Sequence, residues 1–207
     1  MIFFIYQLLI SIILLFSPII IIYRILKNKE DKIRVKEKFC FFSKKRGVGK
    51  LVWFHGSSVG EIMSVIPIIM KYDNDKSINK ILVTSSTLSS ANILNKIKFK
   101  KTIHQFYPVD HFFFSKKFLD YWRPNISIFL ESEIWPSMFK SLKKRNIPLI
   151  LLNSRITNKT FGRWSKLGNF SKSIFNLIDV AYPQNNETKI FLQELNVKNI
   201  KIIGNLK

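Results

Sequence analysis

Few of the residues that build disulfide frameworks and metal centres occur in this sequence. It has one cysteine, Cys40, and three histidines among 207 residues. A single cysteine excludes an internal disulfide and a cysteine-based metal cluster, and no two histidines have the HxxxH or HExxH spacing typical of zinc sites. We therefore expect neither a disulfide-stabilised domain nor a metal centre.

Acidic residues are also scarce. Lysine and arginine number 34 and aspartate and glutamate 13, so the formal net charge is 34 − 13, or +21. Part of this excess reflects a composition rich in Ile, Lys, Asn and Phe, but so basic a chain is expected to meet anionic partners. Because no RNA- or DNA-binding motif accompanies the charge, we favour an acidic membrane surface or a phosphorylated substrate over nucleic acid.

Charge is missing altogether from residues 2–23. A helix of this length, with a rise of about 1.5 Å per residue, can cross the hydrocarbon core of a bilayer. The stretch lacks the basic start and cleavage site of a signal peptide, and seven lysines and arginines follow between residues 24 and 38. The sequence therefore predicts a single-pass transmembrane anchor over residues 1–23, with the rest of the chain in the cytoplasm. The alternative is a buried N-terminal helix.

Residues 24–50 are predicted to be a basic membrane-proximal linker. Phe39, Phe41 and Phe42 are interspersed with lysines there. This pattern is typical of segments that lie among the headgroups of anionic lipids.

From residue 51 onward, short apolar runs alternate with helical periodicity. The predicted strands cover residues 51–54, 80–84, 126–130, 148–152, 180–182 and 201–203, with a weaker one at 103–107. The predicted helices cover residues 61–72, 89–97, 113–122, 136–145, 162–177 and 187–195. This alternation predicts an α/β fold, a doubly wound parallel sheet over residues 51–207.

Polar clusters follow the predicted strands. They include residues 55–61, 85–87, 153–155 and 184–186, together with the acidic residues Asp110, Glu131 and Glu133. Because open α/β sheets bind ligands at the carboxyl ends of their strands, we expect these clusters to share one crevice. Acidic residues are scarce in this chain, so two carboxylates directly after an apolar run support a functional site in this crevice.

Several chemistries can be weighed at this crevice. Residues 56–60 read G-S-S-V-G, a G-x-S-x-G pattern that would make Ser58 a hydrolase nucleophile, but no later histidine has a suitable acidic partner. Dinucleotide-binding and P-loop motifs are absent. Glycosyl transfer fits better, with Glu61 as the base that deprotonates an acceptor. Glu61 could instead only complement the dipole of its helix, and Glu131 and Glu133, which share a face if extended, could only cap the next helix.

The blocks HGSSVGE, TSSTLSS, FYPVD, RPNISIFLESEIWPSMF, IPLILLNSRITNKTFGRW and GNLK occur in this order. Together they resemble the N-terminal half of the 3-deoxy-D-manno-octulosonic acid (Kdo) transferases of lipopolysaccharide synthesis, over nearly the whole chain. The resemblance implies a Rossmann-like sheet, the N-terminal half of a membrane-anchored, two-domain GT-B glycosyltransferase in the cell inner membrane. It also implies CMP-Kdo as the donor substrate, a lipid A precursor as the acceptor, and no further cofactor.

The resemblance also assigns roles to residues. It implies that Glu61 is the general base and that Glu131 or Glu133 is a second essential carboxylate. The other crevice positions, expected to bind the acceptor, are Ser58, Gly60, Asp110, Asn153 and Arg155.

Two departures from the family pattern stand out. Where the family tends to show T-x-T-x-T-G, residues 84–90 read TSSTLSS, without the glycine. The closing GNLK resembles the hinge at which the second, donor-binding domain of the family begins. We therefore expect this chain to act as an acceptor half, whose C-terminal donor domain is supplied by a second polypeptide or by a longer chain of which this sequence is a part. The alternative is a non-catalytic remnant, a membrane-anchored protein that binds lipid A.

Overall fold

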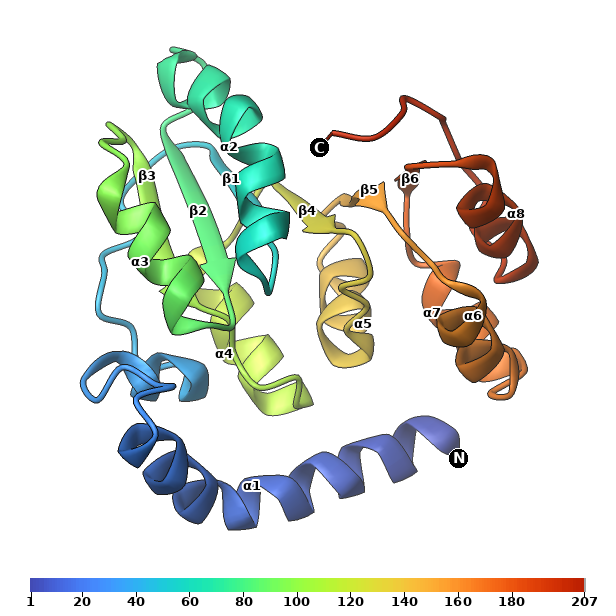
Figure 1. Ribbon diagram of the computed structural model, residues 1–207, viewed down its shortest axis with the longest axis horizontal. Helices are drawn as coiled ribbons and strands as arrows, with labels where there is room; N and C mark the ends of the chain where they lie inside the picture. Colours follow the sequence, from blue (N-terminus) through green and yellow to red (C-terminus); the bar gives the residue numbers. More distant parts are fainter. Residues whose placement is uncertain (207) are drawn as a thin grey trace.

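The computed structural model describes residues 1–206 (Figure 1). A long helix, α1 (Ile2–Leu26), and a 3-10 helix, η1 (Arg34–Phe39), precede a domain in which strands and helices alternate. The strands are β1 (Leu51–His55), β2 (Lys80–Ser85), β3 (Thr102–Phe106), β4 (Ile126–Leu130), β5 (Leu149–Ser154) and β6 (Val180–Pro183). The helices are α2 (Val59–Asn74), α3 (Leu88–Lys96), α4 (Phe112–Trp122), α5 (Pro136–Lys144), α6 (Asn158–Ser165), α7 (Asn169–Phe175) and α8 (Asn186–Glu194).

All six strands belong to one parallel sheet in the order β3-β2-β1-β4-β5-β6. The order reverses between β1 and β4, which makes a crevice at the carboxyl ends of these two strands. Side chains alternate across the sheet: Phe54 packs with α2 and α3 on one face, and Trp53 packs with α4, α5, α7 and α8 on the other. The predicted doubly wound, Rossmann-like α/β fold is confirmed.

Two predicted elements are wrong. Residues 201–203 do not form a strand, because only Ile200 bridges to Ala181 of β6 and the side chains of Ile202 and Ile203 stay exposed. Residues 162–177 are not one helix, because α6 ends at Ser165 and α7 begins after Gly168. Gly168 has φ 53°, a left-handed conformation that a continuous right-handed helix cannot include and that glycine adopts without strain.

The segment at residues 34–43 packs tightly on the domain. Glu37 is fully buried and accepts hydrogen bonds from Arg34 (2.9 Å), from the backbone N–H of Phe106 (2.9 Å) and from Ser43. Phe42 stacks on Tyr121 of α4 with ring centroids 3.9 Å apart. This half of the predicted linker is therefore an integral layer against β3 and α4, and its contact with lipid headgroups stays a prediction.

Helix α1 is long and apolar enough to cross a membrane, by length and composition. It runs alongside the domain, past the ends of α4 and α5, on the side toward which the β2 arrow points (Figure 1). The carboxyl edge of the sheet and α1 thus lie on the same side of the domain.

The buried Glu37 generates a first prediction, on stability. Replacing Glu37 with glutamine removes its charge and weakens its hold on Arg34 at constant volume, so the free energy of unfolding should fall by about 1–3 kcal/mol. Glu194→Gln, at an exposed position of α8, is the matched control and should change it by less than about 0.5 kcal/mol. Urea unfolding of both variants measures the difference; equal values would show that residues 34–43 are not an integral layer.

Candidate functional site

The first turn of α2 holds the Glu61 carboxylate at the crevice. Ser58 is the N-cap of α2; its Oγ accepts a hydrogen bond from the N–H of Glu61 (3.3 Å) and donates to Glu61 Oε1 (2.8 Å). The backbone N–H of Ser57 donates to Glu61 Oε2 (2.8 Å). This capping box fixes both carboxylate oxygens beside the end of β1. The Ser58 hydroxyl is committed to the helix cap, so the hydrolase interpretation has no support here.

Gly56 makes room for this carboxylate. A Cβ atom at residue 56 would lie 2.8 Å from Leu130 Cδ1, 3.1 Å from Glu61 Cβ and 3.3 Å from Glu61 Oε2. The glycine therefore permits the close approach of β1, β4 and α2 at the point where the strand order reverses.

Glu133 lies at the centre of a hydrogen-bond network. Its Oε2 accepts from Ser57 Oγ (2.6 Å), Trp135 Nε1 (2.8 Å) and His55 Nε2 (3.0 Å). His55 is fully buried, with Nδ1 3.0 Å from Thr84 Oγ1. Ser57 thus contacts both acidic residues, through its N–H to Glu61 and its hydroxyl to Glu133.

The His55 ring is also held by an aromatic contact. It stacks on Tyr107, with ring centroids 3.8 Å apart and planes inclined by 22°. Sequence reasoning left His55, Ser57 and Trp135 out of the candidate site, although His55 and Ser57 stand in the same polar cluster as Glu61. The signal available in the sequence was that His55 and Ser57 directly precede the S-V-G-E motif that contains Glu61.

The environments of the two carboxylates push their pKa values apart. Burial, followed by the negative charge of Glu133, raises the pKa of Glu61, and these effects outweigh the hydrogen bonds from Ser58 and Ser57. Burial also opposes ionisation of Glu133, but hydrogen bonds from His55, Ser57 and Trp135 prevail and hold its pKa below the ordinary value. A pair tuned in this way offers a more basic carboxylate beside one that ionises more readily.

Glu131 occupies a different position from the one expected. It has φ 49°, its N–H donates to the carbonyl of Leu152 (3.0 Å), and the N–H of Glu133 turns back to the carbonyl of Leu130 (3.0 Å). Residues 131–133 are therefore a turn and not an extended segment, so Glu131 and Glu133 do not share a strand face. The charge of Glu131 contributes the smallest of the effects that raise the pKa of Glu61.

Asp110 is a buried structural group. Its carboxylate accepts from the N–H groups of Ser137 and Met138 (both 2.9 Å) at the start of α5 and from the hydroxyl of Tyr6 (2.7 Å). Burial raises the pKa of Asp110, against these hydrogen bonds. Its oxygens are occupied by protein donors, so its geometry supports a role in joining α1 to α5.

The remaining candidates lie along the same edge of the sheet. Asn153 is buried with φ 53°, and its Oδ1 accepts from the N–H of Leu206 (3.1 Å). Arg155 is exposed and lines a pocket of about 310 Å³ with residues of α6 and α8. Gly60 is exposed in the first turn of α2. The structure thus gathers Ser58, Gly60, Glu61 and Glu133, while Asp110 and Arg155 belong to neighbouring loops and Asn153 lies near the end of β5.

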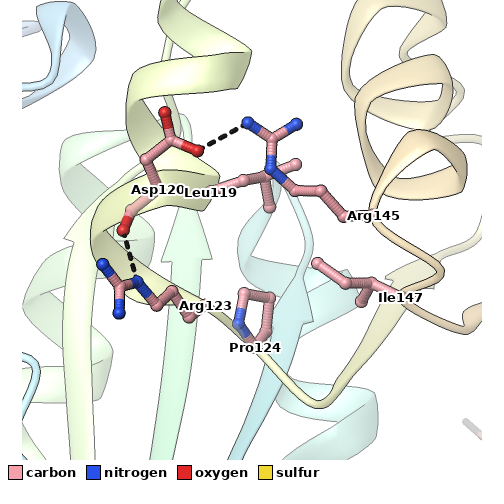
Figure 2. A pocket seen from close by; sticks show the side chains of 6 residues that line it. All are labelled: Leu119, Asp120, Arg123, Pro124, Arg145 and Ile147. Atoms are coloured by element: carbon pink, nitrogen blue, oxygen red, sulfur yellow. Dashed lines mark hydrogen bonds and ion pairs between the residues drawn. The ribbon is translucent and has the colours of Figure 1, made fainter.

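A further pocket, of about 390 Å³, lies away from this edge (Figure 2). Pro124 and Ile147 precede β4 and β5, so the pocket is at the amino ends of the strands. Figure 2 shows Arg145 pointing toward Asp120, with 2.6 Å between Nη2 and Oδ1. This pocket is not part of the crevice. Within residues 1–206, no three His, Cys, Asp or Glu side chains gather so as to hold a metal ion.

Comparison with solved structures defines the class of fold. A UDP-N-acetylglucosamine 2-epimerase from Rickettsia bellii superposes with TM-score 0.52 at 15% identity, covering 77% of this chain and 46% of its own. The enzyme from Neisseria meningitidis gives TM-score 0.51 at 12% identity. At such low identity the likeness concerns the fold alone. Together with the sheet order β3-β2-β1-β4-β5-β6, it defines a doubly wound, Rossmann-like α/β domain.

Sequence comparison then identifies the family. The model of the 3-deoxy-D-manno-octulosonic-acid transferase (kdotransferase) family matches residues 33–207. The 3-deoxy-D-manno-octulosonic acid transferase of Rickettsia bellii is 36% identical over 190 residues, covering 91% of this chain and 45% of the relative. A probable mitochondrial homologue from Arabidopsis thaliana is 38% identical over 152 residues, covering 72% of this chain and 34% of the relative. The chain belongs to the Kdo transferase family and spans less than half the length of these relatives.

The close approach at Gly56 generates the second prediction. Gly56→Ala should lower the free energy of unfolding by about 1–3 kcal/mol, because the added methyl group collides with Leu130 and Glu61. Gly162→Ala, in α6, meets no atom within 4 Å and should be neutral or stabilise by up to about 1 kcal/mol. Denaturant unfolding of the two variants compares them; a Gly56→Ala protein as stable as Gly162→Ala would contradict the packing described.

Proposed function

We propose that this chain is the acceptor-binding half of an inverting glycosyltransferase, which transfers Kdo from CMP-Kdo to a lipid A precursor in lipopolysaccharide biosynthesis. Membership of the Kdo transferase family supports the transfer of Kdo in general. The observation that carries the proposal for this chain is the pair of carboxylates with opposed pKa shifts at the reversal of strand order.

In the proposed reaction, Glu61 accepts the proton of the acceptor hydroxyl. The acceptor oxygen then forms a bond to the anomeric carbon of Kdo, and the bond to the phosphate of CMP breaks with its electron pair, which inverts the configuration. A raised pKa makes Glu61 a stronger base than an ordinary carboxylate. Glu133 keeps its negative charge. It accepts a hydrogen bond from the hydroxyl of Ser57, and the N–H of Ser57 in turn holds the carboxylate of Glu61.

The remainder of the site would come from a second, donor-binding half. Such a half contributes the CMP-Kdo site in the proposed enzyme, either on the same polypeptide or on a separate one. The acceptor carries phosphates and acyl chains, which matches the net charge of +21 and the apolar α1. We place α1 in the cell inner membrane and the domain on its cytoplasmic side, because lysines and arginines follow α1.

The third prediction tests the base. The full chain is combined with the C-terminal half of the Rickettsia bellii relative, and CMP release is measured with CMP-Kdo and a lipid A precursor. Glu61→Gln should lower the rate at least about 10²-fold while the acceptor still binds, because a carboxamide cannot accept the proton. Glu194→Gln is the control and should keep the rate.

The outcomes of this test are distinct. Undiminished turnover in Glu61→Gln would exclude Glu61 as the base. Acceptor binding by the wild-type chain without CMP release, with any donor half, would favour the non-catalytic lipid-binding protein.

The fourth prediction concerns pH. Activity requires ionised Glu61, so the rate falls as pH drops through its pKa. The charge of Glu133 raises that pKa, so Glu133→Gln should shift the acid limb of kcat/KM to lower pH, besides lowering its plateau. Glu194→Gln, at an exposed position of α8, should leave the limb in place. A shift to higher pH, or none, in Glu133→Gln would contradict the coupling between the two carboxylates.

A further inference from the structure

Helix α1 is bonded to the rest of the chain near both of its ends. Near its C-terminus, Arg24 Nε lies 2.7 Å from Glu30 Oε1, and Glu30 also pairs with Lys38 of η1 (2.6 Å). Near its N-terminus, Gln7 Nε2 donates to Ser137 Oγ (2.7 Å), and Gln7 Oε1 accepts from the N–H of Phe112 (2.9 Å). The Tyr6 hydroxyl donates to Asp110, as described above.

These contacts lie on one face of α1. The half-buried positions recur every three or four residues along the helix and are Phe3, Tyr6, Gln7, Ile10, Leu14, Ser17, Ile21, Arg24 and Ile25. Most of the remaining surface of α1 consists of exposed apolar side chains, such as Phe4, Leu8, Leu15 and Ile19. The polar residues Tyr6, Gln7, Ser17 and Arg24 thus lie on the face toward the domain, and a largely apolar surface faces away from it.

The two sets of contacts are incompatible with a helix that crosses a bilayer. Tyr6 lies 18 residues before Arg24, which is about 27 Å along a helix that rises about 1.5 Å per residue. If Arg24 stood at the cytoplasmic surface, Tyr6 would lie near the opposite surface, out of reach of the buried Asp110. Figure 1 shows α1 curving alongside the domain instead. Its sequence includes Pro18, a residue that bends helices.

We propose that α1 lies in the plane of the cytoplasmic leaflet, with its apolar face among the acyl chains and its polar face on the domain. The partner is a lipid surface with anionic headgroups, and the orientation replaces the single-pass span that length alone predicts. Charge complementarity supports this partner. Lys140 Nζ lies 3.7 Å from the centre of the Phe3 ring, Lys144 lies over Phe112 (5.2 Å), and Lys27 lies over Tyr23 (5.9 Å).

This orientation places the crevice beside the lipid surface. Ser137, which Gln7 contacts, follows Glu133 by four residues, and Trp135 between them donates to Glu133. A lipid-borne acceptor could therefore reach Glu61 by lateral diffusion. The inference rests on the membrane association in the proposed function, so membrane association is measured separately.

The experiment uses the full chain bound to vesicles that contain anionic phospholipid, recovered by flotation. Ser11→Cys is combined with His111→Cys, because Ser11 Oγ and His111 Nε2 are 3.4 Å apart. The matched control combines Ile13→Cys with His111→Cys, since Ile13 is exposed and lies on another face of α1 at nearly the same position along it. A short bismaleimide cross-links each pair; native Cys40 is 1% exposed and stays unreactive.

We expect cross-linking within one chain for the Ser11 pair, at least about fivefold above the Ile13 pair, since residues 11 and 13 lie about 200° apart around a helix. A floated protein in which neither pair reacts, or both react equally, would overturn the in-plane orientation and leave the proposed function intact. A cross-linked dimer would overturn it in favour of a second copy on this face. Failure to float would overturn the membrane association itself.

Discussion

The three hydrogen bonds that hold the Glu133 carboxylate are the contacts on which the arrangement of the crevice depends. The donors come from three places: His55 at the end of β1, Ser57 in the following turn, and Trp135 before α5. Removing a carboxylate from water costs free energy unless hydrogen-bond donors replace the water. The position of Glu133 therefore depends on all three donors. Ser57 connects this network to Glu61, and the negative charge of Glu133 contributes to the raised pKa of Glu61.

Several residues contribute both to the packing of the fold and to the site. Thr84 receives a hydrogen bond from Trp53 in the core (2.9 Å) and contacts His55 in the crevice. Gly56 is at once a packing requirement of β4 and an opening for Glu61. The serines of residues 84–90 are likewise engaged: Ser85 contacts His104 (2.9 Å) and Ser86 contacts Ser57 (3.1 Å). Thr87 and Ser90 also contact each other, with 2.7 Å between their hydroxyl oxygens.

Asp110 links the apolar helix α1 to the domain. It satisfies N–H groups at the start of α5 that a helix leaves unpaired, and it accepts from Tyr6 of α1 with the same carboxylate. Asp110, which the sequence led us to expect in the crevice, thereby attaches α1 to the domain. The basic composition, the apolar helix and the crevice are the features on which the proposed chemistry on an anionic lipid rests.

Much of this architecture was predictable from the sequence, because strand and helix periodicity and the capping pattern S-x-x-E are properties of neighbouring residues. The alternation of elements predicted the doubly wound sheet, and the placement of polar clusters after strands predicted the edge that carries the site. By itself the sequence thus determined the class of fold and the position of Glu61 at the start of a helix. Only the tertiary structure brought His55 against Glu133, 78 residues away, turned residues 131–133 out of an extended form, packed residues 34–43 on the domain and set α1 along its edge. The reason is physical: contacts between distant residues depend on which groups the assembled sheet buries, and no local pattern records that.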